Sequence, residues 1–220
     1  MAEKFGAFDG DDRAQSAMDW AQAHWKKVVA GVVAVVAVVA VVGIYRWNAE
    51  RNAVQAESAL YRAQSAFQSQ NTQLAQTDLG RVIDQFPGTP AATQAAMLLA
   101  QTFFDESKWD EGIAALRRVE GRGSAEEFQA SVQSLIGVGL EGKGDYPAAA
   151  TAYLAAAEAT EFDLDAQAYR SDAARAYTEA GNVAEATRLW TELLDLPNSP
   201  YAAEARVRLG ELTARTAQQS

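Results

Sequence analysis

The longest apolar stretch of the chain lies near its N-terminus, at residues 28–45. Eighteen consecutive residues carry no charge there, and ten of them are valine. A bilayer core of ~30 Å is crossed by about 20 apolar helical residues, with ~17 as the lower limit. Valine favours strands in water, but in lipid an isolated segment satisfies its backbone only as a helix. The pattern therefore predicts one transmembrane helix at 26–47 rather than a buried core helix.

Polar and aromatic residues mark both ends of this run. Trp25, Lys26 and Lys27 precede it, and Arg46 and Trp47 follow it. Tryptophan is enriched where a bilayer meets water, and 22 residues of helix place the two indoles about 33 Å apart. We expect these five residues at the two membrane interfaces. No small-residue cleavage site follows the apolar core, so the run is interpreted as an uncleaved signal anchor.

The orientation of the anchor rests on a small asymmetry. Three basic residues lie within about 20 positions on either side, so the positive charges are equal in number. The adjacent Lys26 and Lys27 and the short N-terminal tail favour a cytoplasmic N-terminus and an exported C-terminal domain.

In two short segments, apolar or small residues recur at a spacing that places them on one face of a helix. Residues 1–25 form a short tail whose apolar positions 14, 17, 18, 21 and 25 predict either an interfacial helix or an extension of the spanning helix. Within the anchor, Ala30, Ala34 and Ala37 share one face, and small residues let helices pack closely in lipid. This face is a candidate contact for a partner helix. The alternative is that it reflects only the repeated Val-Val-Ala composition.

Beyond Trp47 the chain is rich in alanine and is punctuated by Gly, Pro and Asn. Small and large apolar residues recur there at a spacing of 37, in four sets: Ala63, Ala100, Gly137, Ala174; Ala75, Gly112, Ala149, Ala186; Leu79, Leu116, Tyr153, Trp190; Val82, Val119, Ala156, Leu193. Such a period is typical of stacked helix pairs, in which small residues occupy close helix crossings and large residues fill the neighbouring grooves.

The turn residues predict where each helix begins and ends. We expect helix pairs at 50–69 with 73–85, 90–105 with 109–120, 125–141 with 146–159, and 165–180 with 183–195, then a last helix at 199–216. The predicted fold class is all-α: a single N-terminal transmembrane helix, followed at 48–220 by an α-solenoid of about four helix pairs and a C-terminal capping helix.

The order of small, aromatic, alanine and large apolar positions resembles the tetratricopeptide repeat (TPR). The segments Phe86-Pro87-Gly88-Thr89-Pro90-Ala91 and Leu196-Pro197-Asn198-Ser199-Pro200-Tyr201 resemble repeat starts of bacterial envelope members. The period of 37 exceeds the usual value of about 34, and the early tryptophan is missing. With one N-terminal span, a short tail and the Tyr45-Arg46-Trp47 exit, the architecture is similar to the YfgM-type ancillary subunits of the bacterial Sec translocon.

This resemblance implies a non-catalytic scaffold for protein–protein interaction. Its expected location is the bacterial inner membrane, single-pass, with a cytoplasmic N-terminus and a periplasmic C-terminal domain. Its expected partners are membrane lipid, the Sec channel, and periplasmic chaperones or client peptides. The alternative is a structural accessory subunit of another large membrane complex, respiratory or photosynthetic.

Composition and charge argue against several classes of function. The net charge is −10, and residues 48–220 hold 24 acidic against 14 basic residues, so this part repels nucleic acid. The chain has no cysteine and one histidine, His24, which argues against histidine-based catalysis and clustered transition-metal sites. We therefore expect no catalytic residue, no cofactor and no metal site.

Two patterns in the repeats need an interpretation. The segment 137–142 matches G-x-G-x-x-G, but a dinucleotide site needs a strand before it, and here the segment ends a predicted helix.

The first helices of the pairs are expected to line a concave groove for peptides or partner segments. By the repeat register its candidates are Gln94, Met97, Gln101, Phe104, Ser131, Ser134, Val138, Ser171, Arg175 and Thr178, although half of these would equally suit a solvated surface.

Overall fold

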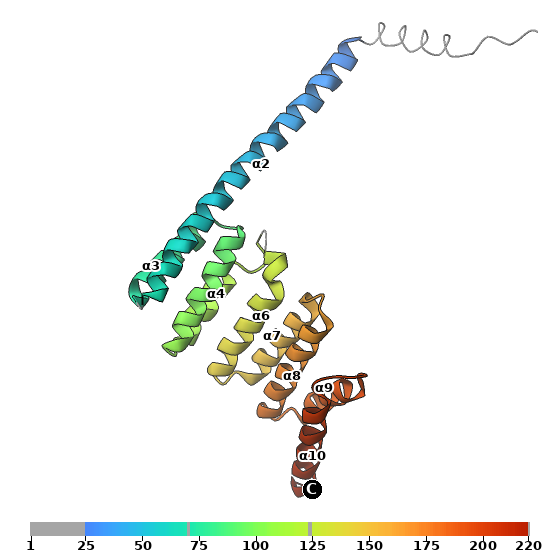
Figure 1. Ribbon diagram of the computed structural model, residues 1–220. Helices are drawn as coiled ribbons and strands as arrows, with labels where there is room; N and C mark the ends of the chain where they lie inside the picture. The colour runs from blue at the N-terminus through green and yellow to red at the C-terminus, as the bar shows by residue number, and fades with distance from the viewer. Residues whose placement is uncertain (1–24, 70, 123–124, 220) are drawn as a thin grey trace, which may run out of the picture. The chain divides into compact units, whose positions relative to one another are not determined.

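A computed structural model of the protein describes residues 25–69, 71–122 and 125–219 (Figure 1). The chain divides into two compact units, Met1–Arg51 and Asn52–Ser220, which are taken separately below. Helix α2, Trp25–Gln68, contributes to both. The stripe expected at 14–25 lies outside the described residues except for Trp25.

The described part of the first unit is the N-terminal portion of α2. The valine-rich run continues this helix without a break, and its large side chains are exposed, from 49% at Val29 to 67% at Val41. By length and composition the helix is apolar enough to cross a membrane, with a mean hydropathy of 2.9 over 18 residues, none of them buried. So much exposed aliphatic surface is unfavourable in water and favourable in a bilayer.

The second unit is built from the C-terminal part of α2 and the helices that follow. Throughout the described residues every regular element is a helix, which confirms the expected all-α class. The further helices are α3 Thr72–Gln85, α4 Pro90–Asp105, α5 Trp109–Arg117, α6 Ala125–Gly142, α7 Tyr146–Ala159, α8 Asp163–Glu179, α9 Val183–Asp195 and α10 Ala202–Gln219.

These helices form a solenoid, because each of α3 to α9 packs against the next in the chain (Figure 1). The helix predicted at 50–69 is the C-terminal part of α2, which begins at Trp25. The bounds of the other helices lie within two residues of the predicted ones, with two larger differences. Helix α5 ends at Arg117 rather than at 120, before a turn that holds Gly121 at a φ of +67°. Helix α10 begins at Ala202 rather than at 199, because Pro200 and Tyr201 still belong to the preceding turn, in which Asn198 takes a φ of +59°.

The 37-residue register runs through the hydrophobic core. The largest members of one set, Leu79, Leu116, Tyr153 and Trp190, are all at most 3% exposed. Burying each such side chain contributes ~1.5–3 kcal/mol, so the repeated positions are the main stabilising feature of the stack.

The turn between the two helices of a pair follows the same register. Ser107, Gly144 and Gly181 are spaced by 37, and all three have positive φ angles of 58°, 79° and 72°. In the last two pairs the next residue caps the second helix: Asp145 accepts from the backbone N–H of Ala148, and Asn182 accepts from that of Glu185. Lys108 stands at this place in α5 and makes no side-chain cap. The α4–α5 turn is therefore the least favourable of the three.

Candidate functional site

The residues expected at the membrane interfaces all lie on the surface of α2. Trp25 is 58% exposed and Trp47 is 57% exposed, and Lys26, Lys27 and Arg46 are exposed beside them. The guanidinium of Arg51 lies 4.3 Å from the centre of the Trp47 ring, a cation–π contact. Ala30, Ala34 and Ala37 are likewise exposed. This helix could therefore present both aromatic ends and a small-residue face to a lipid or protein environment.

The predicted groove residues lie on α4, α6 and α8, and their exposure differs. Gln94, Gln101 and Val138 are exposed, whereas Met97, Ser131, Ser134, Arg175 and Thr178 are partly buried. Phe104 and Ser171 are buried, at 9% and 1% exposure, so neither offers a surface to a ligand in this structure. The Ser171 hydroxyl donates to the carbonyl of Ala168 in its own helix. The other eight positions remain a prediction.

Phe104 is buried because it fills the space above two glycines of neighbouring helices. A Cβ atom at Gly112 would lie 2.3 Å from its ring, and one at Gly139 would lie 2.7 Å from it. Its ring centre also lies 5.5 Å from that of Trp109. The repeat register placed Phe104 on the correct helix, but its long side chain turns inward where the neighbouring backbones leave room.

The G-x-G-x-x-G segment is a packing surface within α6. Gly137 lies beneath the ring of Tyr153, Gly139 beneath Ile113 and Phe104, and Gly142 beneath Trp109. A Cβ atom at any of these three glycines would come within 2.7 Å of a neighbouring side chain. The three glycines therefore let helices approach closely, and no strand precedes them among the described residues, as a dinucleotide site would need.

A charged network joins α6, α7, α8 and α10. Arg175 donates two hydrogen bonds of 2.9 Å to the carboxylate of Glu204, and its guanidinium lies 2.5 Å from Asp172. Nearby, the Tyr153 hydroxyl donates to Glu141 over 2.8 Å. Bidentate pairs of this kind are strong and directional. Because Arg175 is engaged in this way, it is not free to hold the carboxylate of a partner.

The network shifts the pKa values of its members in different directions. The hydrogen bonds from Arg175 lower the pKa of Glu204, and the same pair raises the pKa of Arg175. Burial raises the pKa of Asp172 despite the adjacent guanidinium. Burial, followed by the hydrogen bond to Glu141, raises the pKa of Tyr153. Glu204 was not found from the repeat pattern, because the 37-residue register is lost in α10.

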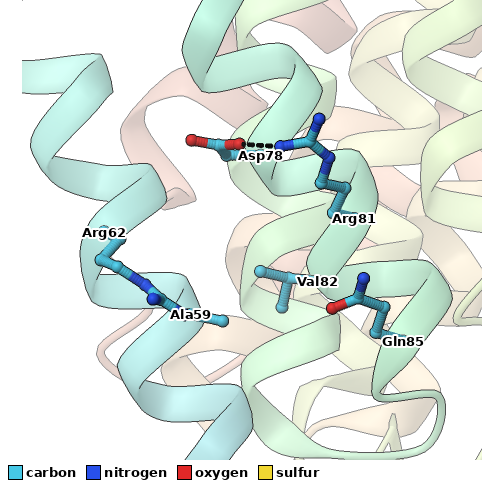
Figure 2. Close-up of a pocket in the computed structure, with 6 residues that line it drawn as sticks. All are labelled: Ala59, Arg62, Asp78, Arg81, Val82 and Gln85. Carbon is cyan, nitrogen blue, oxygen red and sulfur yellow. Dashed lines mark hydrogen bonds and ion pairs between the residues drawn. The ribbon is translucent and has the colours of Figure 1, made fainter.

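A shallow pocket of about 290 Å³ lies between the C-terminal part of α2 and α3. Figure 2 shows its lining, with Ala59 and Arg62 on α2 and the ion pair of Asp78 with Arg81 on α3. Val82 forms the apolar centre between them. Because Val82 is only 2% exposed, the pocket presents mainly charged and polar side chains.

The repeat register explains why this end of the solenoid is polar. Arg62 stands where the next three repeats have Leu99, Ile136 and Ala173, which are at most 4% exposed. Asp78 likewise stands where they have Ala115, Ala152 and Leu189, at most 7% exposed. Those apolar residues pack in the interior of the stack. Arg62 and Asp78 therefore give the N-terminal edge of the solenoid a polar surface, as the terminal repeats of solenoids require.

The described residues assemble no group of three or more His, Asp or Glu side chains that could hold a metal ion. The described surface includes the exposed apolar part of α2 and several charged side chains at the ends of the solenoid.

Comparison with known proteins agrees with this architecture. Residues 18–196 match the family profile described as a tetratricopeptide repeat-like domain. Comparison with curated proteins gave no match. Among solved structures, the chain is similar to the TPR-like repeats of a Podosopora anserina putative kinesin light chain, with 17% identity and a TM-score of 0.57, over 74% of this chain and 88% of that one. A single-residue variant of those repeats gives 17% identity and a TM-score of 0.56, over 74% of this chain and 87% of that one.

The structural likeness concerns the fold alone, whereas the family profile covers most of the sequence, from before the apolar run to the end of α9. Repeats of this kind are typically non-catalytic scaffolds that bind other proteins. The chain belongs to the tetratricopeptide repeat-like domain family.

Proposed function

We propose that this protein is a membrane-anchored, non-catalytic interaction subunit. In this proposal residues 1–25 are a short tail, 26–47 the anchor and 48–220 the scaffold. One observation carries the proposal: the exposed apolar part of α2 runs as one helix into the first repeat. An anchor of this kind would tether the repeats to a membrane.

The extent of the family match supports the link between anchor and repeats. It begins at residue 18 and so includes the apolar run together with the repeats.

The polar N-terminal edge at Arg62 and Asp78 supports a scaffold that binds partners along its length rather than one extended by further repeats.

The proposed partner is the bacterial Sec translocon, together with the periplasmic chaperones that receive its clients. The support is the resemblance to YfgM-type subunits in the repeats, the single N-terminal span, the short acidic tail and the exit at Tyr45, Arg46 and Trp47. In this arrangement the N-terminus is cytoplasmic and the repeats are periplasmic. The face of Ala30, Ala34 and Ala37 would contact a helix of the channel.

The alternative is a structural accessory subunit of a respiratory or photosynthetic complex. There the same alanine face would pack in a lipid-facing groove of the complex, and the repeats would brace its extrinsic domains. The anchor suits either role, so the two differ only in the partner that it recognises.

Purification from native membranes in a mild detergent separates these functions. The tagged full chain should bring down the Sec channel subunits in stable amounts, and an Ala34→Leu variant should recover less of them because it fills the close helix contact. A matched Val35→Leu variant, on the adjacent face, should recover as much as the wild type. Recovery of haem- or pigment-binding subunits instead would favour the alternative, and recovery of no membrane complex would contradict both.

A further inference from the structure

A hollow at the loop between α7 and α8 shares only Ser131 with the predicted groove and has features that the proposed function does not use. Its volume is about 420 Å³, within the range of ~300–1,000 Å³ that is usual for ligand sites. One wall comes from the first turns of α6 and the other from the first turns of α8. Its lining is Glu127, Ala130, Ser131, Ala159, Thr160, Glu161, Phe162, Asp165 and Tyr169.

The spacing of these residues explains why both walls face the same space. On α8, positions 162, 165 and 169 lie three and four residues apart, so they share one helical face. On α6, positions 127 and 131 are related in the same way. Small residues, Ala130 and Ala159, leave the volume between the walls open.

The hollow is bordered by an exposed aromatic ring. Phe162 is 71% exposed at the N-cap position of α8, and Leu164 in the first turn of the same helix is 65% exposed. An exposed phenyl ring beside a hollow is a common anchor point for a partner.

The charge around the hollow has one sign. Glu127, Glu161 and Asp165 line it, and within the described residues none of the three makes an ion pair or a side-chain hydrogen bond. Between Lys143 and Arg170 the chain has five acidic residues and no basic one. Acidic residues in a first helical turn stabilise the helix dipole, which accounts for Glu127 and Asp165. The helix dipole explains neither the exposed ring of Phe162 nor the absence of basic residues from the lining of the hollow.

We propose that this hollow docks a basic segment of another protein, which places a Lys or Arg side chain among the three carboxylates and an apolar side chain on Phe162. The complementarity of charge selects a cation, and a phenyl ring at the rim favours it further through its negative face. Ser131 and Tyr169 add hydroxyl groups to the lining of the hollow. This inference rests on the proposed interaction function and names the chemistry of one partner segment.

The test uses the full chain in detergent micelles and three fluorescent peptides. The first is a short helical peptide of lysine and leucine, the second has glutamate in place of each lysine, and the third has serine there. Fluorescence anisotropy should show binding of the lysine peptide only, weakened by added salt. Phe162→Ala should weaken it about tenfold, and the double variant Glu161→Gln with Asp165→Asn should weaken it at least as much.

Matched controls separate this site from the general acidity of the domain. Val207→Ala removes another exposed apolar side chain, and Glu57→Gln with Asp195→Asn removes the same number of charges elsewhere. Both should bind the peptide as the wild type does. Equal loss in the controls, equal binding in all variants, or binding of the glutamate or serine peptide would overturn the inference.

The same variants distinguish failure of this site from failure of the proposed function. If the lysine peptide does not bind but the wild type still recovers its membrane complex, the docking site is wrong and the interaction function stands. If no complex is recovered, the interaction function is contradicted, whatever the peptide does.

Discussion

Arg175 of α8 and Glu204 of α10 are joined by two hydrogen bonds of 2.9 Å each. The pair fastens the last helix to the first helix of the preceding pair, 29 residues earlier in the chain. A bidentate contact fixes both the distance and the orientation of the two planar groups. It therefore sets how α10 closes the C-terminal end of the solenoid.

This pair makes a prediction about acid stability. The pKa of Glu204 is lowered in the folded protein, so the unfolded chain binds more protons and stability is lost as the pH falls through the folded pKa. The pKa of Asp172 is raised, so its contribution has the opposite sign, and stability rises as the pH falls through its range. We expect Glu204→Gln to flatten the acid limb of thermal stability and Asp172→Asn to steepen it.

Thermal unfolding of the full chain in micelles, followed by circular dichroism from pH 3 to 7, measures both slopes. At neutral pH Glu204→Gln should cost only ~0.2–1 kcal/mol, because the pair is partly exposed. Identical slopes in the two variants would show that the network does not govern acid stability.

The glycines of α6 give a packing prediction. Gly139→Ala places a methyl group 2.7 Å from Ile113 and Phe104, and overpacking of this kind costs ~1–3 kcal/mol. Gly210→Ala is the control, since nothing lies within 4 Å of its new Cβ. There alanine should stabilise the helix by up to ~1 kcal/mol. Denaturant titration should give shifts of opposite sign, and a stable Gly139→Ala protein would refute the packing role of the motif.

The strained turn before α5 predicts a stabilising change. Ser107 holds a φ of +58° at the place where the next two repeats have glycine, so Ser107→Gly should gain about 1 kcal/mol. Ser58→Gly, at an exposed position inside α2, should instead lose about 0.5 kcal/mol through helix propensity. Melting temperatures report both, and a destabilised Ser107→Gly protein would mean that the turn is not strained.

The sequence predicted the helix pairs well because their register is repeated. The turn residues located the bounds of α4, α7 and α9, and the spacing of 37 residues located the buried positions of the Leu79 set. It could not give the direction of a long side chain, and Phe104 turned inward because two glycines, Gly112 and Gly139, come together beneath it only in the fold. The Glu204 contact and the hollow at Phe162 were missed for a related reason, because α10 leaves the register and the α7–α8 loop is not repeated.

The polar edge at the first repeat predicts the state of association. Arg62→Leu with Asp78→Ala would give this edge the apolar residues found at the same register positions in the second repeat. Exposed apolar surface of this kind promotes association, so the double variant should form dimers or larger species in micelles. Arg81→Leu alone, whose register position holds Arg118 in the second repeat, should remain in the wild-type state. Analytical ultracentrifugation distinguishes these results, and an unchanged double variant would contradict the closing role of the edge.

We propose that α2 crosses a membrane and that the repeats lie outside the cytoplasm. Protease added to intact spheroplasts that carry the chain with an N-terminal tag measures this topology. We expect the repeats to be digested while the tag stays intact on a membrane-bound fragment that includes residues 26–47. A tag that is cut while the repeats survive would invert the topology, and the Sec and periplasmic chaperone roles would then be wrong.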